Sequence, residues 1–81
     1  DTFYGLELAY EAGRKGGSLP TVFNAANELA VSQFLNREIK YLEITEIIED
    51  CMKAHKNIEN PTLEQILETE AATYERINSR R

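Results

Sequence analysis

The sequence predicts an all-α fold, a compact bundle of about four helices in a single domain. Three observations lead to this prediction. The chain has 81 residues, the size of one small domain. Apolar residues make up 42% of it, a proportion typical of globular proteins. Apolar residues also recur at helical spacing along several segments, whereas no useful length of strand-like alternation occurs.

The first expected helix covers roughly residues 2–14. One side of it carries the apolar residues at helical spacing: Phe3, Leu6, Ala9, Tyr10 and Gly13. The helix should end near Arg14 and Lys15, because basic side chains suit a last turn. Gly16 or Gly17 can then take the left-handed position that follows a helix.

The second expected helix covers roughly residues 20–36. Pro20 suits its first turn, and Ser18 or Leu19 would precede it as the capping residue. Its circumference is apolar on most sides. One broad face is Val22, Phe23, Ala26, Leu29 and Ala30, and a second face is Asn24, Asn27, Val31 and Leu35. A helix of this kind is normally the central helix of a bundle.

The third expected helix covers roughly residues 43–55. Its apolar residues follow the helical repeat closely: Ile44, Ile47, Ile48, Cys51 and Met52. Three apolar residues precede it and should tuck the connection onto the core, namely Ile39, Tyr41 and Leu42.

The fourth expected helix covers roughly residues 62–79. Thr62 with Gln65 three positions later matches a capping box. Its apolar side is Leu63, Ile66, Leu67, Tyr74 and Ile77. Glu70 interrupts that side, so we expect a break near Thr69, which would cap a new helix.

The charge pattern argues against nucleic-acid and membrane binding. Net charge is −5, and the largest basic cluster is the terminal Arg76, Arg80 and Arg81. A nucleic-acid surface needs a basic stripe, and a lipid anchor needs a polybasic run. No run approaches the roughly 20 apolar residues that span a bilayer. The single cysteine, Cys51, cannot form an internal disulfide, which favours a reducing compartment.

Few residues suggest catalytic or metal chemistry. Cys51 and His55 lie four apart and could both touch a metal, but a structural zinc site needs about four ligands. We favour a core cysteine and an exposed histidine at a helix end. Two carboxylate pairs are expected on solvated faces: Glu46 with Asp50, and Glu64 with Glu68. We expect no catalytic, cofactor-binding or metal-binding residue in the chain.

A polar cluster of Asn24, Asn27 and Glu28 opens the second helix. It could contact a ligand or another domain. Alternatively, its side chains could bond backbone groups of the flanking loops, because a buried unpaired amide costs about 1–3 kcal/mol. On residue chemistry alone we favour the loop contacts.

The N-A-A-N-E-L-A-V run at residues 24–31, with Pro20 before it and Phe34-Leu35 after it, resembles the C-terminal domain of the 1-deoxy-D-xylulose 5-phosphate reductoisomerase family. Weaker matches extend the resemblance over nearly the whole chain: Thr2-Phe3, Leu8-Ala9, Ala12, Ile39, Tyr41, Ile44, Ile47, Ile48, Leu63, Ile66 and Leu67. Two positions depart from the family pattern. Glu70 replaces the usual Asp, and Tyr74 stands near a frequent Arg.

This resemblance implies that residues 1–81 are the C-terminal helical domain of a larger enzyme. The family converts 1-deoxy-D-xylulose 5-phosphate to 2-C-methyl-D-erythritol 4-phosphate with NADPH and Mg or Mn, in non-mevalonate isoprenoid biosynthesis. Its NADPH, metal and phosphate sites lie in preceding domains. The resemblance further implies an inactive fragment that braces the catalytic domain of the same chain. The parent enzyme would be a homodimer in a bacterial cytoplasm or a plastid.

Within that resemblance, Asn24, Asn27 and Glu28 are a structural signature with no catalytic role. An alternative function is a free-standing helical module that binds a partner protein. The motivation is the second helix, whose two apolar sides need more cover than three short neighbours supply.

Overall fold

The computed structural model describes residues 2–80, with side chains from Tyr4 onward. Within residues 2–80 there are helices and no strand, so the predicted all-α bundle is confirmed. None of the described helices is long and apolar enough to span a bilayer. The four helices are α1 (Thr2–Lys15), α2 (Leu19–Leu35), α3 (Glu43–Ala54) and α4 (Leu63–Asn78).

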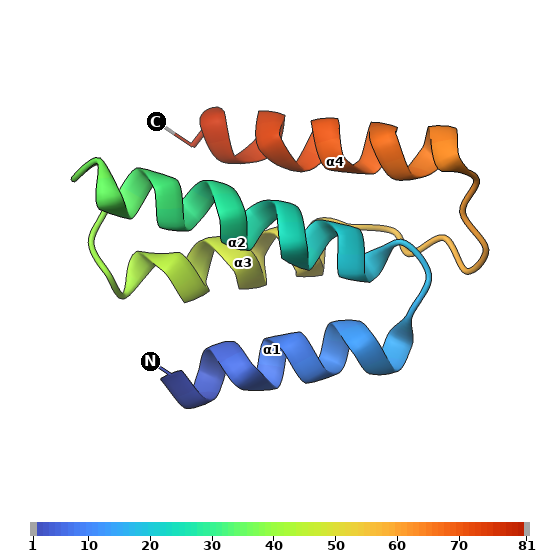
Figure 1. The fold of residues 1–81 in the computed structure, drawn as a ribbon, viewed down its shortest axis with the longest axis horizontal. Helices are drawn as coiled ribbons and strands as arrows, with labels where there is room; N and C mark the ends of the chain where they lie inside the picture. The colour runs from blue at the N-terminus through green and yellow to red at the C-terminus, as the bar shows by residue number, and fades with distance from the viewer. Residues whose placement is uncertain (1, 81) are drawn as a thin grey trace.

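The helices form a flattened bundle of 36 × 26 × 17 Å with α2 at its centre. Figure 1 shows α2 in front of α3, between α1 on one side and α4 on the other. Helix α2 contacts all three neighbours, whereas α1 and α4 do not touch within the described residues. The predicted central helix is therefore confirmed. The buried core is Leu8, Ala12, Leu19, Val22, Ala26, Ala30, Ile47, Ile48, Cys51, Met52 and Ile77.

Two predicted helix ends are confirmed. Gly16 has φ +65° and its N–H donates to the carbonyl of Ala12 at 3.0 Å, which closes α1. At the start of α4, the N–H of Gln65 donates to Thr62 Oγ1, and Gln65 Oε1 accepts from the N–H of Thr62. This capping box satisfies two backbone donors.

The predicted apolar side of α1 is wrong. Leu8 and Ala12 are buried, while Leu6 and Tyr10 are 56% and 72% exposed. Helix α1 packs against both α2 and α3, and small Ala12 lets the helices approach closely. Leu6 and Tyr10 thus lie on the outer side of α1, whereas Leu8 lies on its inner side. Phe3, expected on the apolar side, lies outside the described side chains.

The predicted break in α4 is also wrong, because the helix runs unbroken through Thr69. Its core side holds Thr69, Thr73 and Ile77. The hydroxyl of Thr73 donates to the Thr69 carbonyl at 2.8 Å, so a buried polar side chain is satisfied within the helix. Two leucines expected in the core are exposed, Leu63 at 73% and Leu67 at 56%.

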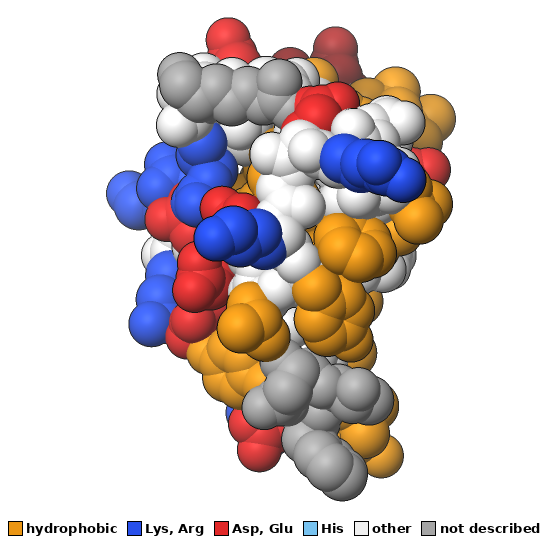
Figure 2. All heavy atoms as spheres, turned by 90° about the vertical axis from the view of Figure 1, so that its left-hand side faces the viewer, with side chains coloured by type: hydrophobic (Ala, Val, Ile, Leu, Met, Phe, Trp, Pro, Cys, Tyr) orange, Lys and Arg blue, Asp and Glu red, His pale blue; other side chains and the backbone are white. Residues whose placement is uncertain are grey.

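The connection between α2 and α3 is only partly packed onto the core. Ile39 packs against it as expected, but Tyr41 and Leu42 are exposed. The Tyr41 ring instead meets Phe34 edge-on, with ring centroids 5.6 Å apart. Figure 2 looks at this end of the bundle and shows hydrophobic side chains gathered on it.

Candidate functional site

The turn between α1 and α2 lies directly against the segment that follows α3. Both Gly16 and Gly17 have φ +65°, which lets the chain turn within two residues. A Cβ added to Gly17 would collide with the carbonyl oxygen of Ile58. The glycine is therefore required for the close approach of these two segments.

Ser18 is the central residue of this contact and has no exposed surface. Its backbone N–H donates to the Ile58 carbonyl at 2.9 Å, and the Ile58 N–H donates to Ser18 Oγ at 2.8 Å. Asn57 Oδ1 accepts from the N–H groups of Ser18 and Leu19 at 3.0 and 2.9 Å. Ser18 makes no side-chain cap of its own, so Asn57 caps α2 from a distant segment.

His55 completes the cluster, with Nε2 2.7 Å from Ser18 Oγ. The histidine follows the last turn of α3 in an extended conformation and is half-buried, although the sequence suggested an exposed residue. Burial lowers the pKa of His55 below its usual value. The ring is therefore favoured in its neutral form.

A serine and a histidine at hydrogen-bond distance could suggest a nucleophile and its base. Here, however, Ser18 Oγ already accepts from Ile58 and lies 3.2 Å from Asn57 Oδ1. Because no surface of Ser18 is exposed, a substrate could not reach Oγ without opening the bundle. The cluster fits a structural bridge between α1–α2 and the segment after α3.

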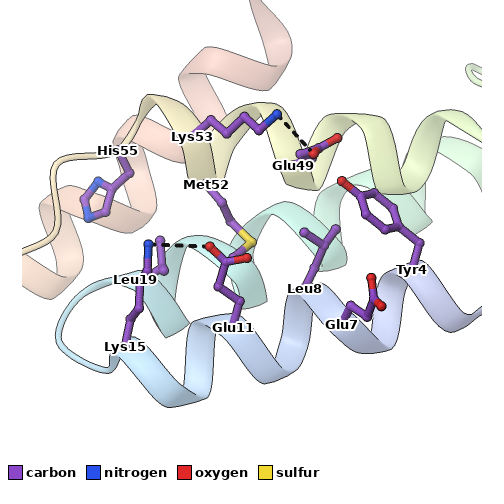
Figure 3. A pocket seen from close by; sticks show the side chains of 10 residues that line it. All are labelled: Tyr4, Glu7, Leu8, Glu11, Lys15, Leu19, Glu49, Met52, Lys53 and His55. Carbon is purple, nitrogen blue, oxygen red and sulfur yellow. Dashed lines mark ion pairs between the residues drawn. The ribbon is translucent and has the colours of Figure 1, made fainter.

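A cleft of about 270 Å³ lies between α1 and α3 beside His55 (Figure 3). Four of its five Lys and Glu side chains are paired along their own helices, Lys15 with Glu11 at 3.5 Å and Lys53 with Glu49 at 3.2 Å. A hydrogen bond to Glu49 raises the pKa of Tyr4 to about 12. Ligand sites usually measure about 300–1,000 Å³. The cleft therefore fits a charged seam between helices better than a ligand site.

Cys51 and His55 do not belong to a larger group of metal-ligating side chains among the described residues. Both residues line a hollow of about 210 Å³ between α3 and α4. Cys51 is buried, and burial raises the pKa of its thiol. No three His, Cys, Asp or Glu side chains within residues 2–80 are grouped so that they could hold a metal ion.

The predicted loop contacts of Asn24 and Asn27 are wrong. Both side chains are exposed, and neither amide forms a hydrogen bond within residues 2–80. The reason is the orientation of α2, whose core side holds Ala26 and Ala30 and places the two amides on the outer side. The side-chain amides of Asn24 and Asn27 thus point away from the core of this domain.

Glu28, the third residue of the cluster, links α2 to α4. The Tyr74 hydroxyl donates to Glu28 Oε1 at 2.8 Å and lies 3.5 Å from Glu70 Oε2. The bond to Glu28 raises the pKa of Tyr74 to about 12. Both positions that depart from the family pattern, Glu70 and Tyr74, thus meet at this contact.

Asp50 provides a second link, between α3 and α4. Arg76 donates to both Asp50 oxygens at 2.9 and 3.1 Å, and Arg80 lies 3.8 Å away. These bonds from Arg76 hold the pKa of Asp50 below its usual value. Asp50 thus forms an ion pair between α3 and α4, and two of the three terminal arginines, Arg76 and Arg80, contact it.

Comparisons with known proteins place the chain in a family. The family model for the DXP reductoisomerase C-terminal domain matches residues 1–76. The chain is 58% identical over 80 residues to a 1-deoxy-D-xylulose 5-phosphate reductoisomerase of Agathobacter rectalis, with 99% of this chain and 21% of that protein covered. It is 53% identical over 77 residues to one from a Thermoanaerobacter species, covering 95% of this chain and 20% of that protein. It thus spans about a fifth of the length of these curated relatives. The chain belongs to the DXP reductoisomerase C-terminal domain family.

Proposed function

We propose that residues 1–81 are the C-terminal helical domain of a 1-deoxy-D-xylulose 5-phosphate reductoisomerase. The whole enzyme would convert 1-deoxy-D-xylulose 5-phosphate to 2-C-methyl-D-erythritol 4-phosphate in non-mevalonate isoprenoid biosynthesis. The observation that carries this proposal is the family match over residues 1–76, together with the identity to relatives of that name. Because those relatives are bacterial, we place the enzyme in a bacterial cytoplasm.

Within that enzyme the domain acts as a structural brace and contributes no catalytic residue. Its polar side chains support this role. Ser18 is fully buried in a bridge, and Glu28 and Asp50 each tie one helix to another. The residues of this domain do not fit a metal site, since within residues 2–80 no three ligating side chains lie together. We therefore assign NADPH and Mg or Mn to the rest of the enzyme, which we take to be a homodimer.

The reading frame of the gene tests this proposal. The proposal expects a long coding stretch upstream of Asp1, with a glycine-rich dinucleotide motif. A start codon at or just before Asp1 would contradict it and would support a free-standing interaction module. The second arm of the test is turnover. The 81-residue chain should not oxidise NADPH when supplied with substrate and Mn²⁺, and turnover would overturn the bracing role.

A further inference from the structure

Helix α2 has one side that no other described helix covers. Helices α1, α3 and α4 pack around it, and its fourth side faces the viewer in Figure 1. We call this side the open face. Its residues recur at helical spacing and are exposed or half-exposed: Asn24, Asn27, Glu28, Val31 and Leu35. An uncovered side is unusual for the central helix of a bundle, which is normally buried all round.

The two asparagines make the open face more than an apolar strip. Their amides each offer two donors and an acceptor oxygen, and no group of the described chain uses them. They project from the second and third turns of a regular helix, which holds them at a fixed spacing. Leu35, 72% exposed, lies at the far end of the same side. A partner could therefore find both polar contacts and apolar area here.

Helix α4 continues this surface. A shallow groove between α2 and α4 is lined by Glu28, Leu29, Ser32, Tyr74 and Asn78. Leu63 and Leu67 precede Tyr74 by eleven and seven positions, so by helical spacing they share its side of α4. Both leucines are more than half exposed. The bond from Tyr74 to Glu28 fixes the two helices relative to each other, so the surface is preorganised.

The opposite side of the bundle has a different character. Helix α3 carries acidic and basic residues there, and several of them form ion pairs, Lys53 with Glu49 and Asp50 with Arg76 of α4. In Figure 2 charged side chains gather toward the α3 side of the end shown, while hydrophobic side chains dominate toward the α2 side. Paired, screened charges are typical of a surface that faces water. The two broad sides of the bundle are thus chemically distinct.

We propose that the open face of α2, with the Leu63, Leu67 and Tyr74 side of α4, is the surface on which the preceding part of the same enzyme chain docks. This inference rests on the proposed function. The chain spans about a fifth of its relatives' length, so most of the enzyme lies outside residues 1–81. The broad side of a bundle of 36 × 26 × 17 Å can supply an inter-domain interface of about 600–1,500 Å².

The preceding part of the chain is favoured over a second copy for a physical reason. A tethered domain meets its neighbour at an effective concentration in the millimolar range, far above that of a separate molecule. The occupant should offer apolar side chains opposite Leu35 and Leu67, and donors or acceptors opposite the amides of Asn24 and Asn27. Unmatched amides buried in that interface would weaken it.

Thiol labelling of the full-length enzyme tests the surface. Single variants Asn27→Cys and Leu67→Cys report on the proposed interface, and Glu46→Cys on the exposed side of α3 is the matched control. Native Cys51 is buried, and peptide mapping reads each introduced position separately, so other cysteines of the full-length enzyme do not enter the comparison. With each variant confirmed to be active, the thiols introduced at positions 27 and 67 should label at least about tenfold more slowly than the thiol introduced at position 46. Equal rates would overturn the proposal.

Three further measurements separate the possible failures. A Leu6→Cys variant probes the outer side of α1, which is also apolar. If the thiol at position 6 is protected while those at positions 27 and 67 label freely, the proposed docking surface is wrong but the bracing role stands. If none of these three thiols is protected, both the docking surface and the bracing role are wrong. If the open face is protected but loses that protection on dilution, a second copy of the enzyme covers it. That result would overturn the proposal that the preceding part of the same chain docks there. Oxidative footprinting of the unmodified enzyme, comparing Leu67 with Leu42, guards against variants that misfold.

Discussion

Removing the hydroxyl of Ser18 should destabilise the 81-residue chain by about 2–3 kcal/mol. Ser18 has no exposed surface, and its Oγ accepts from the Ile58 N–H at 2.8 Å. Ser18→Ala leaves that part-buried backbone donor without its partner, at a cost of about 1–3 kcal/mol, and also removes the contact to His55. A domain of this size has roughly 0.05–0.15 kcal/mol of stability per residue, so the loss is a large share of the total.

Urea unfolding measures this effect as a lower midpoint with an unchanged slope. The matched control is Ser79→Ala. The Ser79 hydroxyl donates to the Glu75 carbonyl, but it is exposed, so its loss should cost less than about 0.5 kcal/mol. An Asn57→Ala variant shares the cluster, and its cost should not add to that of Ser18→Ala, with a coupling of about 0.5–3 kcal/mol. A Ser18→Ala cost no larger than the Ser79 control, or full additivity, would refute the bridge.

Three more predictions concern the same chain. Ile47→Ala should lower the free energy of unfolding by about 2–5 kcal/mol, because Ile47 is buried in the core. Leu63→Ala, at a site 73% exposed, should lower it by less than about 0.5 kcal/mol. Similar losses for the two variants would contradict the exposed position of Leu63 on α4. Burial lowers the pKa of His55, so the unfolded chain takes up the proton first, and urea midpoints should fall as pH drops below 6.5. His55→Gln removes the only histidine and should abolish that slope between about pH 7 and 5. Gly17→Ala should lower the melting temperature more than Gly16→Ala, because both have φ +65° but only Gly17 lacks room for a Cβ; equal shifts would count against the close approach.

The fold could be predicted from local patterns because each helix carries signals for its own start, end and period. The repeat of Ile47, Ile48 and Cys51 gives the buried side of α3 directly, and the Thr62 and Gln65 pair gives the start of α4. The inner sides of α1 and α4 could not be read in the same way. Each of these helices carries large apolar residues on two sides, so the helical period alone does not say which side is covered. In α1 Leu8 is buried and Leu6 exposed, and in α4 Ile77 is buried and Leu67 exposed.

The cluster around Ser18 could not be predicted because its partners are distant in sequence. Ser18 and His55 are 37 positions apart, and neither lies in a motif that signals the other. The only local hint is the Gly16-Gly17 pair before Ser18, which signals a tight turn but not its partner. Sequence reasoning therefore placed Ser18 at the start of α2 but missed its contacts with Ile58 and His55, and it missed Asn57 altogether.

The Asn24 and Asn27 amides illustrate a different limit. Reasoning from a small domain alone assigned them partners inside it, since buried amides must be satisfied. The structure turns them outward instead, and neither amide has a hydrogen-bond partner among the residues that the structure describes. The family resemblance identified them as a signature without saying what they contact.

The most direct test of the architectural role is the double variant Asn24→Ala with Asn27→Ala in the full-length enzyme, compared with Glu46→Ala on α3. If the signature residues support domain docking, the double variant should unfold at a lower temperature than the control. Its kcat/KM at low temperature should stay within about threefold of the parent, a difference of about 0.7 kcal/mol. An unchanged melting temperature with a fall in kcat/KM of about a hundredfold or more would contradict the account and place these residues in the chemistry.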